Sequence, residues 1–227
     1  MHLQSEHHPA ATQSGPWLTA AQEAAVAKLA YAAEHPGCVV LLCGPAGVGK
    51  TMLLGHVART GIPGVRGIGI RDLGESRPQR DAVPEPDVAD VILVDHADRT
   101  TAAELVALVE SWWARRPESV VVLAGQGRLL SLCLGDARLE RRVVLRATVP
   151  VFTVRESRRL LASVLGGSAP APADAVLDAI HEIAGGVPAV ALRIADMAAV
   201  LAAADPDRRL VPDDIEAIHR RLCIRAA

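Results

Sequence analysis

Short apolar runs alternate with longer amphipathic segments through the first two thirds of the chain. Each run is bounded by Gly, Pro or charged residues, as expected for strands buried on both faces of a sheet. The predicted strands are 38–43, 65–70, 91–95, 119–124 and 143–149. The predicted helices among them are 20–34, 50–60, 101–116 and 128–134. Strands that alternate with helices pair in parallel through right-handed crossovers, so the predicted fold class is α/β.

After residue 152 the pattern changes to helices only. They are predicted at 154–165, 173–184, 188–204 and 212–224, between turns rich in Gly and Pro. The chain therefore divides into three predicted parts: a loose N-terminal tail (1–18), a three-layer α/β/α core with a parallel sheet (19–152), and an all-helical lid (153–227). The polar, Pro-containing segment 71–86 has no clear period and is predicted to be an irregular connection.

Composition narrows the function classes. The formal charge of −2 and the five aromatic residues among 227 give no general signal for nucleic acid or an anionic membrane. The longest apolar segment, 187–204, is interrupted by Arg193 and Asp196, so no membrane span is predicted. The four cysteines lie in apolar surroundings without a CxxC pair, as reduced thiols in a cytoplasmic protein do. They are Cys38, Cys43, Cys133 and Cys223.

A phosphate-binding loop of the form GxxxxGK[ST] follows the first strand and opens the next helix. Its glycines allow backbone N–H groups to surround phosphate oxygens, Lys50 neutralises phosphate charge, and the Thr51 hydroxyl joins a Mg²⁺ shell. Lys50 is one of only two lysines in the chain, so a lysine at this position of the loop is not expected by chance. The alternative is a relic loop that no longer binds. The predicted nucleotide-binding residues here are Gly44, Pro45, Ala46, Gly47, Val48, Gly49, Lys50, Thr51 and Met52.

Four apolar residues lead into Asp95 about 45 residues further on. A carboxylate at the end of a neighbouring strand holds Mg²⁺ in such proteins, so Thr51 and Asp95 are the predicted metal-binding residues. Hydrolytic proteins of this class usually carry Glu next, to polarise the attacking water, but this chain has His96. A neutral imidazole can accept a proton, with a different reach and charge from a carboxylate. Hydrolysis is therefore left open, and Asp98 is expected in the following loop.

Five segments follow one another in the order and spacing of AAA+ ATPases, and the chain resembles that family over residues 19–223. It is most similar to the ExeA-like group, the ATPase component associated with general secretion. Its neighbours are transposition-helper ATPases of the TniB, TnsC and MuB kind. The glycine loop is common to many families, and the segments that point to this group are Leu-Ala-Gly-Gln at 123–126 and the Gly-Gly-Val-Pro turn at 185–188. The segments are 41–51, 91–98, 120–126, 139–142 and 185–188.

The resemblance implies two further catalytic residues. Gln126 matches sensor 1, a polar side chain facing the γ-phosphate; the alternative is a helix cap. Arg142 matches the arginine finger, which reaches the nucleotide of an adjacent subunit, so a homo-oligomer is implied. Several arginines crowd that region, and a solvated arginine face is the alternative. With Lys50, Asp95 and His96, these complete the predicted catalytic set.

Two positions depart from the family pattern. His96 replaces the catalytic Glu, and Ala189 stands where the sensor 2 Arg usually follows the Gly-Gly-x-Pro turn. Arg193, on the same helix face, is the candidate to reach the nucleotide instead. The ExeA-like relatives often continue into a membrane span and a wall-binding domain, which this sequence lacks, so only the ATPase module is predicted.

The resemblance thus implies a Mg²⁺–ATP-dependent motor or switch that oligomerises and remodels a protein or DNA partner. The alternatives are a nucleotide-gated scaffold that hydrolyses slowly or not at all, and a transposition helper that binds DNA. The absence of an N/TKxD motif favours ATP over GTP. The arginines that could bind DNA phosphates are Arg155, Arg158, Arg159, Arg220, Arg221 and Arg225.

Overall fold

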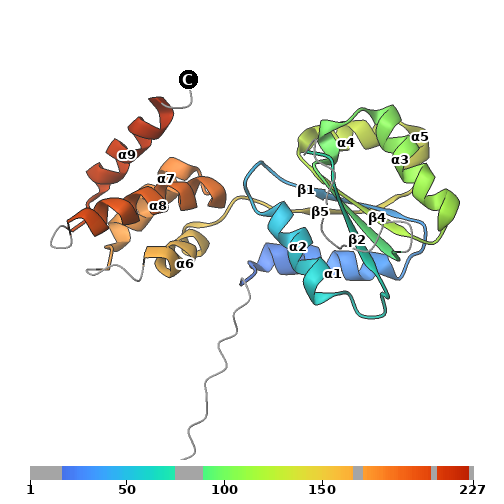
Figure 1. Cartoon of the computed structure of the whole chain (residues 1–227), viewed down its shortest axis with the longest axis horizontal. Coiled ribbons are helices and arrows are strands. Elements are labelled where there is room, and N and C mark those ends of the chain that lie inside the picture. Colours follow the sequence, from blue (N-terminus) through green and yellow to red (C-terminus); the bar gives the residue numbers. More distant parts are fainter. Residues whose placement is uncertain (1–16, 75–88, 166–170, 206–208, 225–227) are drawn as a thin grey trace, which may run out of the picture.

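A five-stranded parallel sheet forms the centre of the computed structural model, which describes residues 17–74, 89–165, 171–205 and 209–224 (Figure 1). The strand order is β2-β3-β4-β1-β5, and all four pairings are parallel. This confirms the predicted α/β class. The strands are β1 (Val39–Cys43), β2 (Ile68–Asp72), β3 (Val91–Asp95), β4 (Val120–Gly125) and β5 (Val143–Thr148).

Helices cover both faces of the sheet, because successive residues of the buried strands point to opposite sides. On β1, Val40 and Leu42 pack toward α1 (Ala20–Ala33) and α2 (Lys50–Thr60). Leu41 packs on the opposite side with α3 (Ala102–Arg115) and α4 (Gly127–Leu134). Two hydrophobic cores result, and together they hold the strand ends in fixed positions.

Local sequence signals explain where several helices begin. Thr19 and Thr101 each cap a helix with the reciprocal capping box, through Gln22 and Glu104 three residues later. The adjacent tryptophans at the end of α3 anchor it: Trp112 is buried, and the Trp113 indole N–H donates to the Ser119 carbonyl at 2.9 Å.

The second strand begins later than predicted, at Ile68 rather than residue 65, and it continues through Asp72. Because β2 is an edge strand that pairs only with β3, its polar end can follow its neighbour while remaining partly exposed. Two short helices were not predicted: the 3₁₀ turn η2 (Ala97–Arg99) and α5 (Ala137–Glu140). The rest of the predicted irregular connection, from residue 75 on, and most of the predicted tail lie outside the described residues.

The C-terminal helices form a hydrophobic core of their own around Leu161, Ile180, Ile194 and Ile215. They lie together at one end of the molecule, beyond the chain that leaves β5 (Figure 1). In the part of the chain that the structure describes, no helix is long and apolar enough to cross a membrane. These helices are α6 (Val154–Leu165), α7 (Asp174–Ala184), α8 (Pro188–Ala204) and α9 (Pro212–Ile224).

The start of α8 meets the phosphate loop. The Ala189 N–H donates to the Gly47 carbonyl at 3.1 Å, and the Phe152 N–H donates to the Gly186 carbonyl at 2.8 Å. Gly186 has φ +70°, and a Cβ there would lie 2.5 Å from the Phe152 carbonyl oxygen, so only glycine fits this turn. The Gly-Gly-Val-Pro segment therefore places the first residues of α8 against the predicted nucleotide site.

Candidate nucleotide-binding site

The phosphate loop joins the carboxyl end of β1 to the first turn of α2. Gly47 and Gly49 have φ +77° and +97°, which a residue with a side chain adopts only with strain. The Gly44 N–H donates to the Gly125 carbonyl at 3.3 Å and so ties the loop to the end of β4. These glycines hold the loop over the N-terminus of α2, where free backbone N–H groups and the helix dipole favour an anion.

Lys50 folds back over the loop. Its ammonium group donates to the Gly44 carbonyl at 2.8 Å and to the Pro45 carbonyl at 2.7 Å, and the residue is 9% exposed. Burial lowers the pKa of Lys50, while the negative charges of Asp95 and Asp98 act in the opposite direction. The loop thus holds a cation at its centre, beside the helix N-terminus.

Asp95 ends β3 and is 3% exposed. One carboxylate oxygen accepts a 2.5 Å hydrogen bond from the Thr51 hydroxyl, and the other accepts one of 2.8 Å from the His96 N–H. A hydroxyl and a carboxylate are the hard oxygen donors that Mg²⁺ prefers, and here they are within hydrogen-bonding distance of each other. The residues present therefore fit a Mg²⁺ ion held by Thr51 and Asp95.

His96 has φ +53° and is the one non-glycine residue with positive φ in the described part of the chain. Its Nδ1 lies 2.8 Å from Asp72 Oδ1, and the same oxygen accepts a 2.7 Å hydrogen bond from the Gly74 N–H. Burial would raise the pKa of Asp72, but the hydrogen bonds from Gly74 and His96 and the nearby charge of Arg99 hold it below its usual value. Asp72 is therefore an ionised acceptor beside the imidazole.

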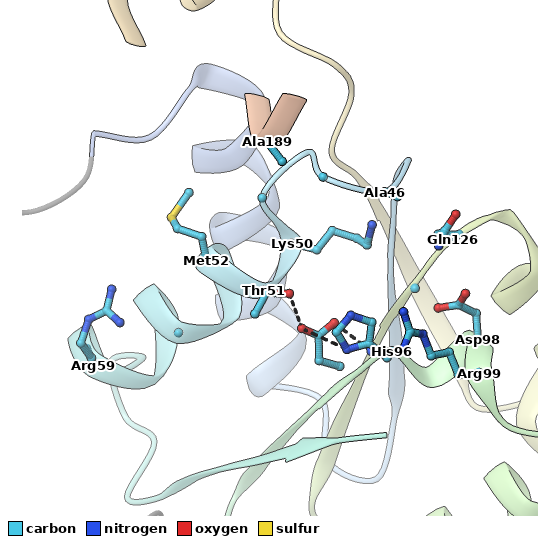
Figure 2. Close-up of a pocket in the computed structure, with 15 residues that line it drawn as sticks. Ala46, Lys50, Thr51, Met52, Arg59, His96, Asp98, Arg99, Gln126 and Ala189 are labelled. Carbon is cyan, nitrogen blue, oxygen red and sulfur yellow. Dashed lines mark hydrogen bonds and ion pairs between the residues drawn. The ribbon is translucent and has the colours of Figure 1, made fainter. Parts of the chain in front are cut away.

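A pocket of about 530 Å³ brings most of the predicted residues together. Figure 2 shows Lys50, Thr51 and His96 around one space, with Gln126 across from them and Ala189 at the edge. Gln126 is exposed and makes no capping hydrogen bond with α4, so its side chain is available to a ligand. The predicted residues in the lining are Ala46, Gly47, Gly49, Lys50, Thr51, Met52, Asp95, His96 and Gln126.

Three charged residues of the lining were not predicted as part of the site: Arg59, Asp98 and Arg99. Arg59 lies in the last turn of α2, while Asp98 and Arg99 belong to η2. Asp72, which binds His96, was missed as well. It ends β2 as Asp95 ends β3, and the two are register partners. A strand predicted as far as residue 72 would have revealed a second strand-terminal carboxylate.

Two predicted residues lie elsewhere in the chain. Arg142 is at the amino end of β5, where its guanidinium donates to the Gly37 carbonyl at 2.9 Å and lies 4.5 Å from the centre of the Trp113 ring. That is the opposite end of the sheet from the pocket. Arg193 is exposed on α8 and is not part of the pocket lining. Their roles as a finger and a nucleotide contact remain predictions.

Two of the three arginines at the start of the helical region, Arg158 and Arg159, make contacts within the chain. Arg158 donates to both carboxylate oxygens of Asp178 at 2.6 Å and to Asp174 at 2.9 Å. Arg159 lies 4.5 Å from the centre of the Trp17 ring. Two of the six arginines proposed for DNA phosphates thus already interact with other side chains of this chain.

Comparison of the sequence with protein-family models and with curated proteins finds no match. Solved structures do match. A point mutant of RuvB from Thermotoga maritima is 20% identical with a TM-score of 0.63, covering 89% of this chain and 71% of RuvB. Another structure of RuvB from that organism, a Holliday junction branch migration motor, is 19% identical with a TM-score of 0.59, covering 88% of this chain and 69% of RuvB.

The AAA domain of FIGL-1 is also similar, at 18% identity and a TM-score of 0.59, covering 89% of this chain and 80% of that domain. Its complex with ADP is 19% identical with a TM-score of 0.55, covering 82% of this chain and 72% of that one. At these identities the likeness concerns the fold. The chain has the AAA+ form of the P-loop α/β fold, and the narrower resemblance to the ExeA-like group remains a prediction.

Proposed function

We propose that this protein is an AAA+ ATPase that couples Mg²⁺–ATP binding and slow hydrolysis to oligomerisation or to the remodelling of a protein or DNA partner. The observation that carries the proposal is the 2.5 Å hydrogen bond between Thr51 and Asp95, beside Lys50 in one pocket. It unites the phosphate loop with a strand-terminal carboxylate, as Mg²⁺–nucleotide chemistry requires. The ADP complex of the FIGL-1 AAA domain supports nucleotide binding by this fold.

Each residue has a defined part in this proposal. Lys50 and the loop N–H groups bind the phosphates, and Thr51 and Asp95 hold Mg²⁺, which would neutralise phosphate charge when bound. The Gln126 amide donates to the γ-phosphate or orients the attacking water. His96, which lines the same pocket, accepts a proton from that water in this proposal. Met52, at the pocket edge, contacts the nucleotide beyond the phosphates.

The experiment uses the purified chain. Binding of a fluorescent ATP analogue and release of inorganic phosphate are measured for wild type, Lys50→Ala and Lys28→Ala. Lys28 is the other lysine, and it donates to the Arg146 carbonyl at 3.1 Å on the exposed surface, so its variant is a matched control. We expect Lys50→Ala alone to lose binding and phosphate release. Equal values for all three proteins would end the proposal.

A second candidate function is a nucleotide-gated switch that binds ATP without appreciable hydrolysis. The observation that favours it is His96, which has no carboxylate and is held by Asp72 in a strained backbone conformation. This candidate predicts an ATP-dependent change in oligomer size by light scattering, abolished by Lys50→Ala, with phosphate release at the level of buffer. Phosphate release that depends on Lys50 would exclude it.

The partner is proposed as protein or DNA. The likeness to RuvB, a Holliday junction branch migration motor, supports DNA, while the arginines engaged within the chain favour protein. The two kinds of partner are distinguished by measuring how much DNA the purified protein retains with and without ATP, across a series of salt concentrations. A DNA-binding ATPase requires retention that depends on ATP and falls steeply with salt.

A further inference from the structure

We propose that Asp72 is a positioning residue that fixes the orientation and tautomer of His96, so that His96 replaces the catalytic glutamate of the hydrolytic site. The inference rests on the proposed ATPase function and deepens it. It starts from the register of the sheet: Asp72 and Asp95 are partners on the parallel strands β2 and β3. The residue after Asp95 is thereby placed beside the Asp72 carboxylate.

The Asp72 carboxylate is itself fixed. Asp72 Oδ1 accepts from the Gly74 N–H at 2.7 Å and contacts His96 Nδ1 at 2.8 Å, while the Leu73 N–H donates to the Asp95 carbonyl at 3.1 Å. An ionised carboxylate only accepts hydrogen bonds, so Nδ1 is the nitrogen that carries hydrogen. In the neutral imidazole, Nε2 is then the acceptor.

The backbone around His96 supports this arrangement. A φ of +53° is unusual for a residue with a side chain, and such strain often occurs at functional sites. The His96 ring also needs the space beside Gly74: a Cβ on Gly74 would lie 2.9 Å from both Cγ and Nδ1 of the ring. The turn after β2 therefore provides the carboxylate that binds the ring and the space that admits it.

The His96 ring is part of the pocket lining, next to the residues predicted to bind Mg²⁺. His96 lines the pocket with Thr51, Asp95 and Gln126, and its Nδ1 lies 3.9 Å from Asp95 Oδ2. In the proposed step, the oxygen of a water molecule bonds to the γ-phosphorus as the bond to the β,γ-bridging oxygen breaks, and that bond's electron pair leaves with ADP. His96 Nε2 accepts the proton of the water and later returns it to solvent. An acceptor fixed by a carboxylate follows the same logic as an Asp–His pair in other hydrolases.

The test compares Asp72→Asn, His96→Ala and the double variant at one pH. The control is Asp196→Asn, which makes the same chemical change at an exposed position on α8. We expect Asp72→Asn to lower kcat by about 10- to 100-fold, as loss of a partner that orients a reactive group does, with ATP affinity and KM unchanged. The double variant should be no slower than His96→Ala, because the two residues act as one unit.

A second readout does not depend on turnover. Nitrogen-15 NMR of histidine-labelled protein reports which ring nitrogen carries hydrogen, and the His96 signal is identified by its loss in His96→Ala. We expect the Nδ1–H form in wild type and a change in Asp72→Asn. Gly74→Ala keeps Asp72 and His96 unsubstituted, but its Cβ would lie 2.9 Å from the His96 ring and 3.1 Å from Asp72 Oδ1, so it should disturb their contact and reproduce the low kcat of Asp72→Asn.

The proposal is overturned if Asp72→Asn turns over ATP like Asp196→Asn, or if wild-type His96 carries its hydrogen on Nε2. A chain that binds ATP through Lys50 but releases no phosphate also overturns it, and leaves nucleotide binding standing. A chain that does not bind ATP refutes the proposed function itself. The two failures are thus distinguished by the binding measurement.

Discussion

The Thr51 hydroxyl donates a 2.5 Å hydrogen bond to Asp95 Oδ2 and so joins the first turn of α2 to the end of β3. These residues are 44 positions apart in sequence, and β4 lies between β1 and β3 in the sheet. The contact therefore depends on the correct strand order as well as on the two motifs. It places a hydroxyl and a buried carboxylate where a divalent cation can join them.

Replacement of the Thr51 hydroxyl should separate magnesium binding from loop structure. We expect Thr51→Val to weaken Mg²⁺-dependent ATP affinity about tenfold or more, since a hydrogen bond to a charged group contributes about 1.5–3 kcal/mol. Thr51→Ser keeps the hydroxyl and is the control. Titration with a fluorescent ATP analogue, with Mg²⁺ and with EDTA, measures both. Equal Mg²⁺ dependence in the two variants would remove Thr51 from the metal site.

Two glycines with similar backbone angles allow steric contact to be separated from strain. Gly47 has φ +77°, and a Cβ there would lie 2.9 Å from the Val187 side chain and 3.0 Å from that of Ala189. Gly64 has φ +81°, and nothing lies within 4 Å of its Cβ position. Alanine at either site should cost about 1–2 kcal/mol of stability, because both require left-handed backbone.

Only Gly47→Ala should also disturb the contact between the phosphate loop and α8. We therefore expect it to weaken ATP binding, while Gly64→Ala binds like wild type. Thermal unfolding measures the stability of both variants, and titration with ATP measures their affinity. If Gly64→Ala loses as much affinity as Gly47→Ala, general destabilisation explains the result and the loop–helix contact does not.

The sequence predicts the fold well where a segment carries its own signal. The β3 strand and the helices α2, α6, α8 and α9 have the predicted bounds, because apolar runs, caps and Gly–Pro turns are local features. The α5 helix was missed because it has only four residues and follows an Asp136 cap within a segment rich in charge.

The candidate site was predictable only in part, for a physical reason. The phosphate loop and Asp95 belong to motifs that can be read along the chain. Asp72 and Arg59 reach the site through strand register and the length of α2, which depend on packing between distant segments. A predicted strand that ended at residue 70 excluded Asp72 from the sheet and so from the site.

Arg142 is expected to have a structural role that must be separated from its predicted role as a finger. Its contacts with the Gly37 carbonyl and the Trp113 ring together stabilise the core by about 1–2 kcal/mol, so Arg142→Ala should lower the melting temperature. A finger acts between subunits, so mixing Arg142→Ala with Lys50→Ala protein should restore phosphate release that neither shows alone. Arg141→Ala, at the exposed neighbouring position, is the control. A mixture as inactive as its components would remove Arg142 as the finger.

Ala189 stands at the position where related ATPases usually carry the sensor 2 arginine, so an arginine can be introduced there. It lines the pocket and its N–H donates to the Gly47 carbonyl, so its side chain starts next to the phosphate loop. A guanidinium at this position would face the bound phosphates, and a charge-assisted hydrogen bond there contributes about 1.5–3 kcal/mol. We therefore expect Ala189→Arg to tighten ATP binding about tenfold, with a smaller effect on ADP because the γ-phosphate is absent.

The matched variants are Ala189→Gln, which adds a long neutral side chain, and Arg193→Ala, which tests the existing arginine on the same helix. Because Arg193 is exposed and outside the pocket lining, its loss tests whether the part of α8 that carries Arg193 moves toward the nucleotide on binding. The affinities of Ala189→Arg, Ala189→Gln and Arg193→Ala for ATP and for ADP are measured by titration. If Ala189→Gln tightens ATP binding as much as Ala189→Arg, charge is not the cause. If Arg193→Ala alone weakens binding, the existing arginine already contacts the nucleotide, and α8 must move to bring it there.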